Sequence, residues 1–143
     1  MTAIEFLRPA LALVLWTFVM WFWLYLTRIP AMQKAKIDPQ QAASPSAGNW
    51  KEKLPPSVVS TADNYNHLHE QPVLFYALML IAAVSGGADY IAWYLAWGYV
   101  GLRVVHSIVQ ATTNIVMIRF SIFSLASFVL FALGIKEALR VFL

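Results

Sequence analysis

The chain has 143 residues, of which 60% are apolar and only 12% are charged. A soluble domain of this length cannot bury so much hydrophobic surface, so the composition excludes an ordinary soluble protein and implies that lipid covers the excess. The chain contains no cysteine, which excludes disulfides and cysteine-ligated metals, and its net charge of +3 comes without a basic patch interleaved with aromatic residues, so we expect no nucleic-acid partner.

The first predicted element is a membrane span near the N-terminus. Residues 10–27 are uncharged and rich in aromatic side chains, and they are followed by Arg28, which is typical of a membrane interface. A helix needs roughly 20 apolar residues to cross a bilayer core of about 30 Å, so we predict a span over about residues 8–28. A cleaved secretory signal is the alternative, but the apolar stretch is longer than the usual core of such a signal.

A polar segment and a second span follow. Residues 29–57 are rich in Lys, Gln, Ser and Pro and have no apolar periodicity, which predicts a solvated loop. Pro55, Pro56 and the hydroxyl residues after them favour a helix start, and the uncharged run that begins after Glu70 predicts a second span over about residues 58–87. Gly86 and Gly87 are suited to end that helix, and Asp89 to open the next.

The last two predicted spans cover about residues 89–114 and 119–142. Their short connections imply antiparallel neighbours, and lipid offers no partners to unpaired backbone groups. We therefore predict an all-α fold, a single transmembrane domain over residues 1–143 that forms an up-and-down four-helix bundle. Lys and Arg gather in the loop at 29–57 and recur at Arg119, so both loops are expected in the cytoplasm and both termini on the other side.

Polar side chains inside the predicted spans are the candidates for function, because placing them in a membrane is costly. A polar stripe with spacings of three or four residues follows one face of the third span: Tyr99, Arg103, His106, Gln110 and Asn114. A second stripe lies at the start of the second span: Asp63, Asn66, His67 and Glu70. We expect the two stripes and Arg119 to meet in one intramembrane cavity, in which carboxylates oppose the arginines.

Other interpretations of these residues remain open. Glu70 and Arg103 could form a buried ion pair that only fixes helix register, with Asn66 and His106 as interhelical hydrogen bonds. A metal site is not expected, because two of the three histidines, His67 and His69, are two residues apart and point to different helix faces. The serines of the last two spans have no convincing base beside them and are typical of helix packing.

Three motifs together indicate a family resemblance. They are the segment NHLHEQPVLF at residues 66–75, the segment RVVH at residues 103–106, and Arg119, in a four-span chain of about this length. In this order they resemble the membrane-associated proteins in eicosanoid and glutathione metabolism, the MAPEG family, in a divergent bacterial-type form. The resemblance covers essentially the whole chain. It implies a homotrimer of four-helix bundles that holds glutathione between neighbouring subunits near the cytoplasmic side.

The resemblance also implies roles for single residues. Arg119 is the catalytic candidate, since a guanidinium beside a thiol favours the nucleophilic thiolate. The ligand-binding candidates are Asn66, Glu70, Arg103, His106 and Gln110. The chain departs from the family pattern at Ala62, where many catalytic members have arginine, and at Gln110, where they often have tyrosine. Glu70 also follows Asn66 by four residues, whereas better-known members space this pair by three.

The function expected from this resemblance is that of a glutathione-dependent transferase or peroxidase. Its co-substrate would be glutathione, its second substrate a lipophilic electrophile from the bilayer, and no metal is expected. The alternative is a non-catalytic scaffold or accessory subunit of a larger membrane complex. In both cases we expect a multi-pass integral membrane protein, homotrimeric and surrounded by lipid, in the inner membrane if the cell is bacterial.

Overall fold

The structure, a computed structural model, describes residues 1–46 and 48–143, and these ranges are helical without any β-strand. This confirms the predicted all-α fold class. The elements in chain order are α1 (Ala3–Phe6), α2 (Arg8–Lys34), α3 (Pro39–Ala42), the 3₁₀-helix η1 (Trp50–Lys53), α4 (Pro56–His67), α5 (Pro72–Val84), α6 (Tyr90–Ala111) and α7 (Val116–Phe142).

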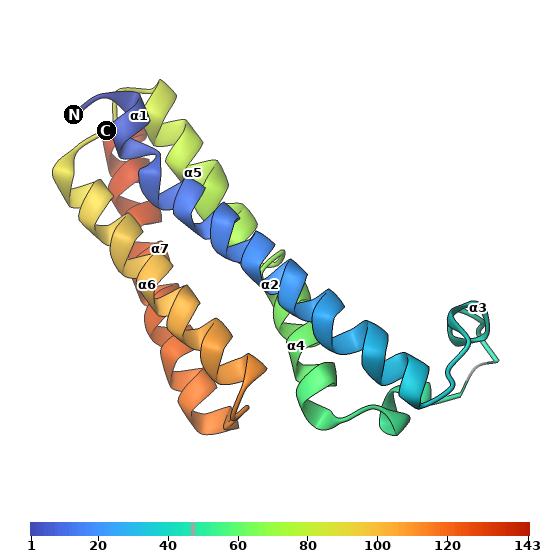
Figure 1. Cartoon of the computed structure of the whole chain (residues 1–143). Helices are drawn as coiled ribbons and strands as arrows, with labels where there is room; N and C mark the ends of the chain where they lie inside the picture. The colour runs from blue at the N-terminus through green and yellow to red at the C-terminus, as the bar shows by residue number, and fades with distance from the viewer. Residues whose placement is uncertain (47) are drawn as a thin grey trace.

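The long helices pack side by side (Figure 1). Helices α6 and α7 form an antiparallel hairpin, α2 packs on α4 and α6, and α5 packs on α7 and α1. Both chain termini lie at one end of the molecule, whereas the α6–α7 turn and the segment with α3 lie toward the other. This arrangement agrees with the predicted antiparallel order of neighbours.

Three helical segments are long and apolar enough to cross a membrane: α2, the α4–α5 segment Pro56–Val84, and α7. Large apolar side chains on their outer surfaces are exposed, as Phe22 on α2 and Phe128 on α7 illustrate. Lipid would cover such side chains at no hydrophobic cost. Helix α6 is not among the three, and it is the helix with the buried polar stripe, so the count of four spans stays a prediction.

Helix α2 continues beyond the predicted end of the first span. The predicted loop begins at residue 29, but α2 runs through Pro30 and ends at Lys34. A proline inside a helix removes one backbone hydrogen bond, and the helix continues here on the bonds of its neighbours. The polar segment that remains holds the short helices α3 and η1. Asp38 caps α3 by accepting a hydrogen bond from the backbone N–H of Gln40 at 2.9 Å.

The second predicted span is divided into two helices. Helix α4 starts at Pro56, in the first-turn position where a proline loses no helical hydrogen bond, and it ends at His67. Helix α5 starts at Pro72, whose nitrogen carries no hydrogen to donate back into the preceding turn. The break at residues 68–71 leaves carbonyl groups at the end of α4 without helical partners and turns Glu70 out of the helix.

The α5–α6 connection follows the sequence prediction. Gly86 adopts a φ of +80°, a left-handed conformation that glycine accepts without strain, and Asp89 caps α6 by accepting a hydrogen bond from the backbone N–H of Ala92 at 2.8 Å. The C-terminal end of α7 holds this connection in place. Nη1 of Arg140 donates to the carbonyl oxygen of Ser85 at 2.8 Å, and the ammonium of Lys136 pairs with Asp89.

One predicted member of the polar stripe lies elsewhere. Helix α6 ends at Ala111, and Asn114 follows it in a left-handed conformation with a φ of +50°. The prediction that Asn114 continues the stripe is therefore wrong, because the helical periodicity stops before this residue. Instead, Oδ1 of Asn114 accepts a hydrogen bond from Nη1 of Arg119 at 2.7 Å, within the turn that starts α7.

Candidate functional site

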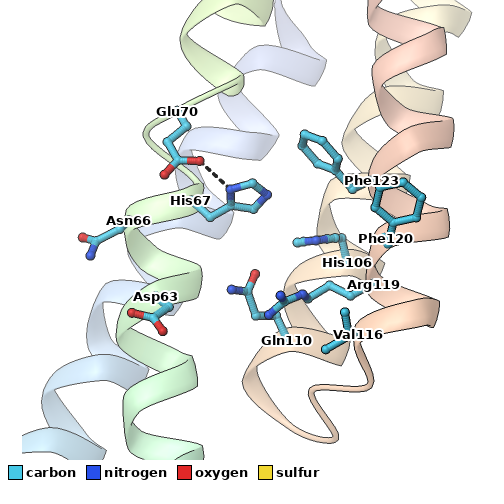
Figure 2. A pocket seen from close by; sticks show the side chains of 10 residues that line it. All are labelled: Asp63, Asn66, His67, Glu70, His106, Gln110, Val116, Arg119, Phe120 and Phe123. Carbon is cyan, nitrogen blue, oxygen red and sulfur yellow. Dashed lines mark hydrogen bonds and ion pairs between the residues drawn. The ribbon is translucent and has the colours of Figure 1, made fainter. Parts of the chain in front are cut away.

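A cavity of about 490 Å³ lies between α4 and the α6–α7 hairpin (Figure 2). The break after α4 and the short turn before α7 bring both sides of the cavity to the same end of the molecule. Its lining residues are Asp63, Asn66, His67, Glu70, His106, Gln110, Val116, Arg119, Phe120 and Phe123. The cavity therefore joins residues 63–70 to residues 106–123, which are distant in the sequence.

The two sides of the cavity bear opposite charges. Asp63, Asn66 and Glu70 are exposed along α4 and the turn after it, at the open rim. Arg119 stands opposite, at the start of α7 (Figure 2). Between them, His67 points across the cavity toward His106, and the centroids of these two rings are 5.0 Å apart. A ligand with both a cationic and an anionic group would find a partner for each.

Arg103 lies behind this cavity and is fully buried, with 0% of its surface exposed. Its Nη2 donates to the carbonyl oxygen of His67 at 3.0 Å, and its Nη1 is 3.4 Å from Nε2 of the same residue. Its guanidinium carbon lies 5.8 Å from the centre of the Phe123 ring. The ion pairs found among residues 1–46 and 48–143 do not include Arg103.

Glu70 is not the counter-ion of Arg103. Its Oε2 lies 2.6 Å from Nδ1 of His67, at an exposed position of the cavity rim. The interpretation of Glu70 and Arg103 as a buried pair that fixes helix register is therefore wrong. The break between α4 and α5 explains the difference, because Glu70 does not continue the helix face that carries His67 toward Arg103.

Several buried polar atoms near the cavity have no hydrogen-bond partner among the described residues. They are Nδ1 of His106, Oε1 of Gln110 and Nε of Arg103. Buried polar atoms are nearly always hydrogen-bonded in folded proteins, so unpaired atoms in one place indicate a site where a ligand or water completes the set. His106 and Gln110 both line the cavity, which places two of these atoms beside it.

A polar bridge crosses the bundle above the cavity. The side-chain amide of Gln71 accepts a hydrogen bond from the hydroxyl of Tyr99 at 3.2 Å and donates one to Oγ of Ser127 at 2.8 Å. One residue at the start of α5 thus joins α6 and α7. This bridge fixes the distance between the helices on either side of the cavity.

The structure brings most of the predicted site residues together. Asn66, Glu70, His106, Gln110 and Arg119 line one cavity, and Arg103 lies directly behind it. The catalytic and ligand-binding candidates named from the sequence omit His67, which contacts both Glu70 and Arg103, although its place on the polar face of α4 is a signal for it. They also omit Phe120 and Phe123, because aromatic residues in an apolar helix have no distinctive sequence pattern.

Among residues 1–46 and 48–143, no three histidine or acidic side chains are grouped so that they could hold a metal ion. Two carboxylates, two imidazoles, two amides and a guanidinium line the cavity, and they are suited to binding a small zwitterionic or anionic molecule.

Comparison with known proteins gives one match. The model of the MAPEG family matches residues 6–139, which is nearly the whole chain. No curated protein and no solved structure matches.

Proposed function

Since this chain belongs to the MAPEG family and is an integral membrane protein, we propose that it binds glutathione or a similar charged small molecule and transfers it to lipophilic electrophiles. The binding site is the cavity between α4, α6 and α7. The same bound thiol, with a second glutathione, would reduce lipophilic hydroperoxides to an alcohol and water while the two thiols are oxidised to a disulfide. Four spans, a homotrimeric assembly and termini outside the cytoplasm are part of the proposal.

The observation that carries the proposal is the opposite charge of the two cavity sides. Glutathione has one ammonium and two carboxylates, so it needs acidic partners and basic partners at a distance from each other. Asp63 and Glu70 offer the acidic side, and Arg119 offers the basic side. The unpaired atoms of His106 and Gln110 would bond to the peptide groups between the charged ends.

Arg119 is the residue proposed for catalysis. A guanidinium beside the glutathione thiol stabilises the thiolate, which is the nucleophilic form. The thiolate sulfur then forms a bond to an electrophilic carbon, and the leaving group departs with the electron pair of the broken bond. Arg103 acts from behind the cavity, because its buried positive charge attracts an anionic ligand and holds His67 in position.

The second substrate would arrive from the bilayer. Phe120 and Phe123 give the α7 side of the cavity an apolar surface, and Phe120 is 63% exposed. An apolar electrophile partitions into lipid, so an opening on this side of α7 receives it at a high local concentration. The homotrimer we propose would cover the exposed rim at Asp63, Asn66 and Glu70 with a neighbouring copy.

The experiment is a thermal-shift titration of the detergent-purified protein with glutathione, because a ligand that binds the native state raises its apparent stability. We expect a rise for the wild type and none for Arg119→Ala. Arg8→Ala is the matched control, since Arg8 is exposed at the start of α2, away from the cavity residues. Turnover of a lipophilic aryl halide should be lost in Arg119→Ala while the oligomer of this variant stays intact.

The alternative function is a non-catalytic scaffold or accessory subunit, which Ala62 favours because it removes a cation that many catalytic family members place beside the ligand. That function predicts no stabilisation at millimolar glutathione, a silent Arg119→Ala change, and a partner protein that co-purifies in detergent. This result would contradict the transferase proposal.

A further inference from the structure

A second cavity, distinct from the candidate site, lies on the face of the molecule formed by α2 and α4. Its volume is about 350 Å³, and six of its seven lining residues follow one face of α2. They are Trp21, Leu24, Tyr25, Arg28, Ile29 and Met32, with Tyr65 from α4. The cavity is an apolar slot with a single cation, Arg28, at its end near the polar segment.

The cationic end of this slot continues into the polar segment. The guanidinium carbon of Arg28 lies 5.4 Å from the centre of the Trp50 ring, a cation–π contact that holds the end of α2 against η1. Arg28, Trp50 and Lys51 line a narrow cavity of about 40 Å³. Trp50 also lines a polar cavity of about 340 Å³, together with Lys36 and Lys53.

The cations of this region are not neutralised by its acidic residues. Residues 28–53 contain five basic side chains, Arg28, Lys34, Lys36, Lys51 and Lys53, and two acidic ones, Asp38 and Glu52. Asp38 caps α3, and Glu52 accepts a hydrogen bond from Asn49. The ion pairs of the chain's described part include none of the five cations, so their positive charge is available to an external anion.

We propose that this α2–α4 slot and its cationic end form a binding site for an anionic phospholipid. The acyl chain lies in the apolar slot, and the phosphate contacts Arg28 and Lys51. Aromatic residues line both parts, Trp21 and Tyr25 beside the chain and Trp50 beside the headgroup, as is typical of the boundary between hydrocarbon and water. Basic clusters next to a membrane span attract anionic lipids in the same way.

The combination of slot and charge selects this ligand. A nucleic acid or a free phosphate would use the cations but leave the slot empty, and a neutral lipid would use the slot but leave the cations without a partner. Only a molecule with an apolar chain and an anionic group at one end of that chain fills the slot and also pairs with the cations. The α2–α4 slot shares no lining residue with the candidate glutathione cavity, whereas Asp63 and Asn66 line both that cavity and the narrow cavity beside Arg28 and Lys51. The variants below therefore change Arg28, Lys51 and Ile29, none of which lines the glutathione cavity.

The test is native mass spectrometry of the protein released from micelles that contain equal amounts of phosphatidylglycerol and phosphatidylcholine with identical acyl chains. We expect phosphatidylglycerol adducts to predominate in the wild type. Arg28→Gln with Lys51→Gln should weaken retention of phosphatidylglycerol by roughly tenfold or more, since each cation near a membrane surface contributes to anionic lipid binding. Lys34→Gln, which lines none of these cavities, is the matched charge control.

A second pair of variants tests the slot. Ile29→Trp fills it and should reduce retention of the lipid, whereas Leu26→Trp, on an exposed part of α2 outside the slot, should not. If the variant with both Arg28→Gln and Lys51→Gln does not fold, Lys51→Gln alone replaces it, because Lys51 is exposed, and it should also weaken retention of phosphatidylglycerol.

Three results would overturn the proposal. The first is equal retention of the two lipids by the wild type. The second is competition by glycerol 1-phosphate at the same strength as the intact lipid, which would mean a phosphate site without a chain site. The third is a changed oligomeric mass of Ile29→Trp with unchanged lipid retention, which would mean that a second copy of the chain covers the slot.

Discussion

Nη2 of Arg103 donates a hydrogen bond to the main-chain carbonyl oxygen of His67 at 3.0 Å. His67 is the last residue of α4, so its carbonyl has no i+4 helical partner and accepts a long bond of 3.4 Å from the backbone N–H of Glu70, and the C-terminal end of a helix also bears partial negative charge. The break before Pro72 thus provides the acceptor for a cation that has no carboxylate among its described neighbours. A buried charge that is balanced only by backbone carbonyl groups is weakly compensated, so it can attract an anionic ligand in the adjacent cavity.

The first prediction concerns the stability and binding of Arg103→Leu. We expect the midpoint of thermal unfolding to stay the same or rise, because replacing a poorly compensated buried charge with an apolar side chain is often neutral or stabilising. Stabilisation by glutathione should be lost in this variant and partly retained in Arg103→Lys. A lower midpoint together with unchanged glutathione binding would show that Arg103 is a structural residue only.

The second prediction concerns the close approach of Gly87 to the C-terminal end of α7. A Cβ atom at this position would overlap Oε2 of Glu137 and lie 2.7 Å from Nε of Arg140. Gly87→Ala should therefore lower the free energy of unfolding by about 1–3 kcal/mol, the usual cost of overpacking. Gly101→Ala is the control, since nothing lies within 4 Å of its Cβ, and denaturant unfolding in micelles compares the two. Equal stability of both variants would contradict the prediction.

The third prediction concerns Glu137, a carboxylate with only 2% of its surface exposed. Its two oxygens accept from Lys136 at 3.1 Å and from Arg140 at 2.7 Å. Glu137→Gln leaves two cations without this partner, and we expect a loss of roughly 2 kcal/mol, below the value for a fully buried pair because both cations are partly exposed. Glu52→Gln, at an exposed position, should be neutral in the same unfolding measurement.

The fourth prediction concerns the bridge through Gln71. A double-mutant cycle with Gln71→Leu and Ser127→Ala should give a coupling free energy of about 0.6 kcal/mol, and no more than about 1.7, as for other interhelical hydrogen bonds in membranes. Ser121→Ala replaces Ser127→Ala in the control cycle, because the Ser121 hydroxyl donates to Met117 of its own helix. Additive effects in the first cycle would show that the bridge contributes no stability.

The fifth prediction concerns the number of spans, for which the absence of cysteine is an advantage. Single-cysteine variants at Ser44, Thr113 and Leu143, all exposed, are labelled with a membrane-impermeant thiol reagent in oriented vesicles. If all four helical segments cross the membrane, Ser44→Cys and Thr113→Cys react from one side and Leu143→Cys from the other. Opposite reactivity of the Ser44 and Thr113 variants would mean that only one of the two segments between them, α4–α5 or α6, crosses the membrane.

The sequence by itself determined the helical class, the apolar segments and the polar stripe of α6. These follow from composition and from spacings of three and four residues, which are local properties of a helix. The same local reasoning identified Asp89 as a cap and the glycine pair at 86–87 as a helix end, since each depends only on residues close to it in the chain, and Gly86 is the one that adopts the left-handed conformation. The buried positions of Arg103, His106 and Gln110 on one face of α6 agree with it.

Only the tertiary structure decided which of these polar groups meet. The partner of Arg103 is a backbone carbonyl that loses its i+4 helical partner where α4 ends, and no pattern of side chains encodes that acceptor. Glu70 pairs with His67 instead, because the break before Pro72 changes its direction. The contact of Arg28 with Trp50 likewise joins residues that are distant in the sequence. Such contacts depend on how helices and turns pack in space, whereas sequence spacing specifies only which residues share a helix face.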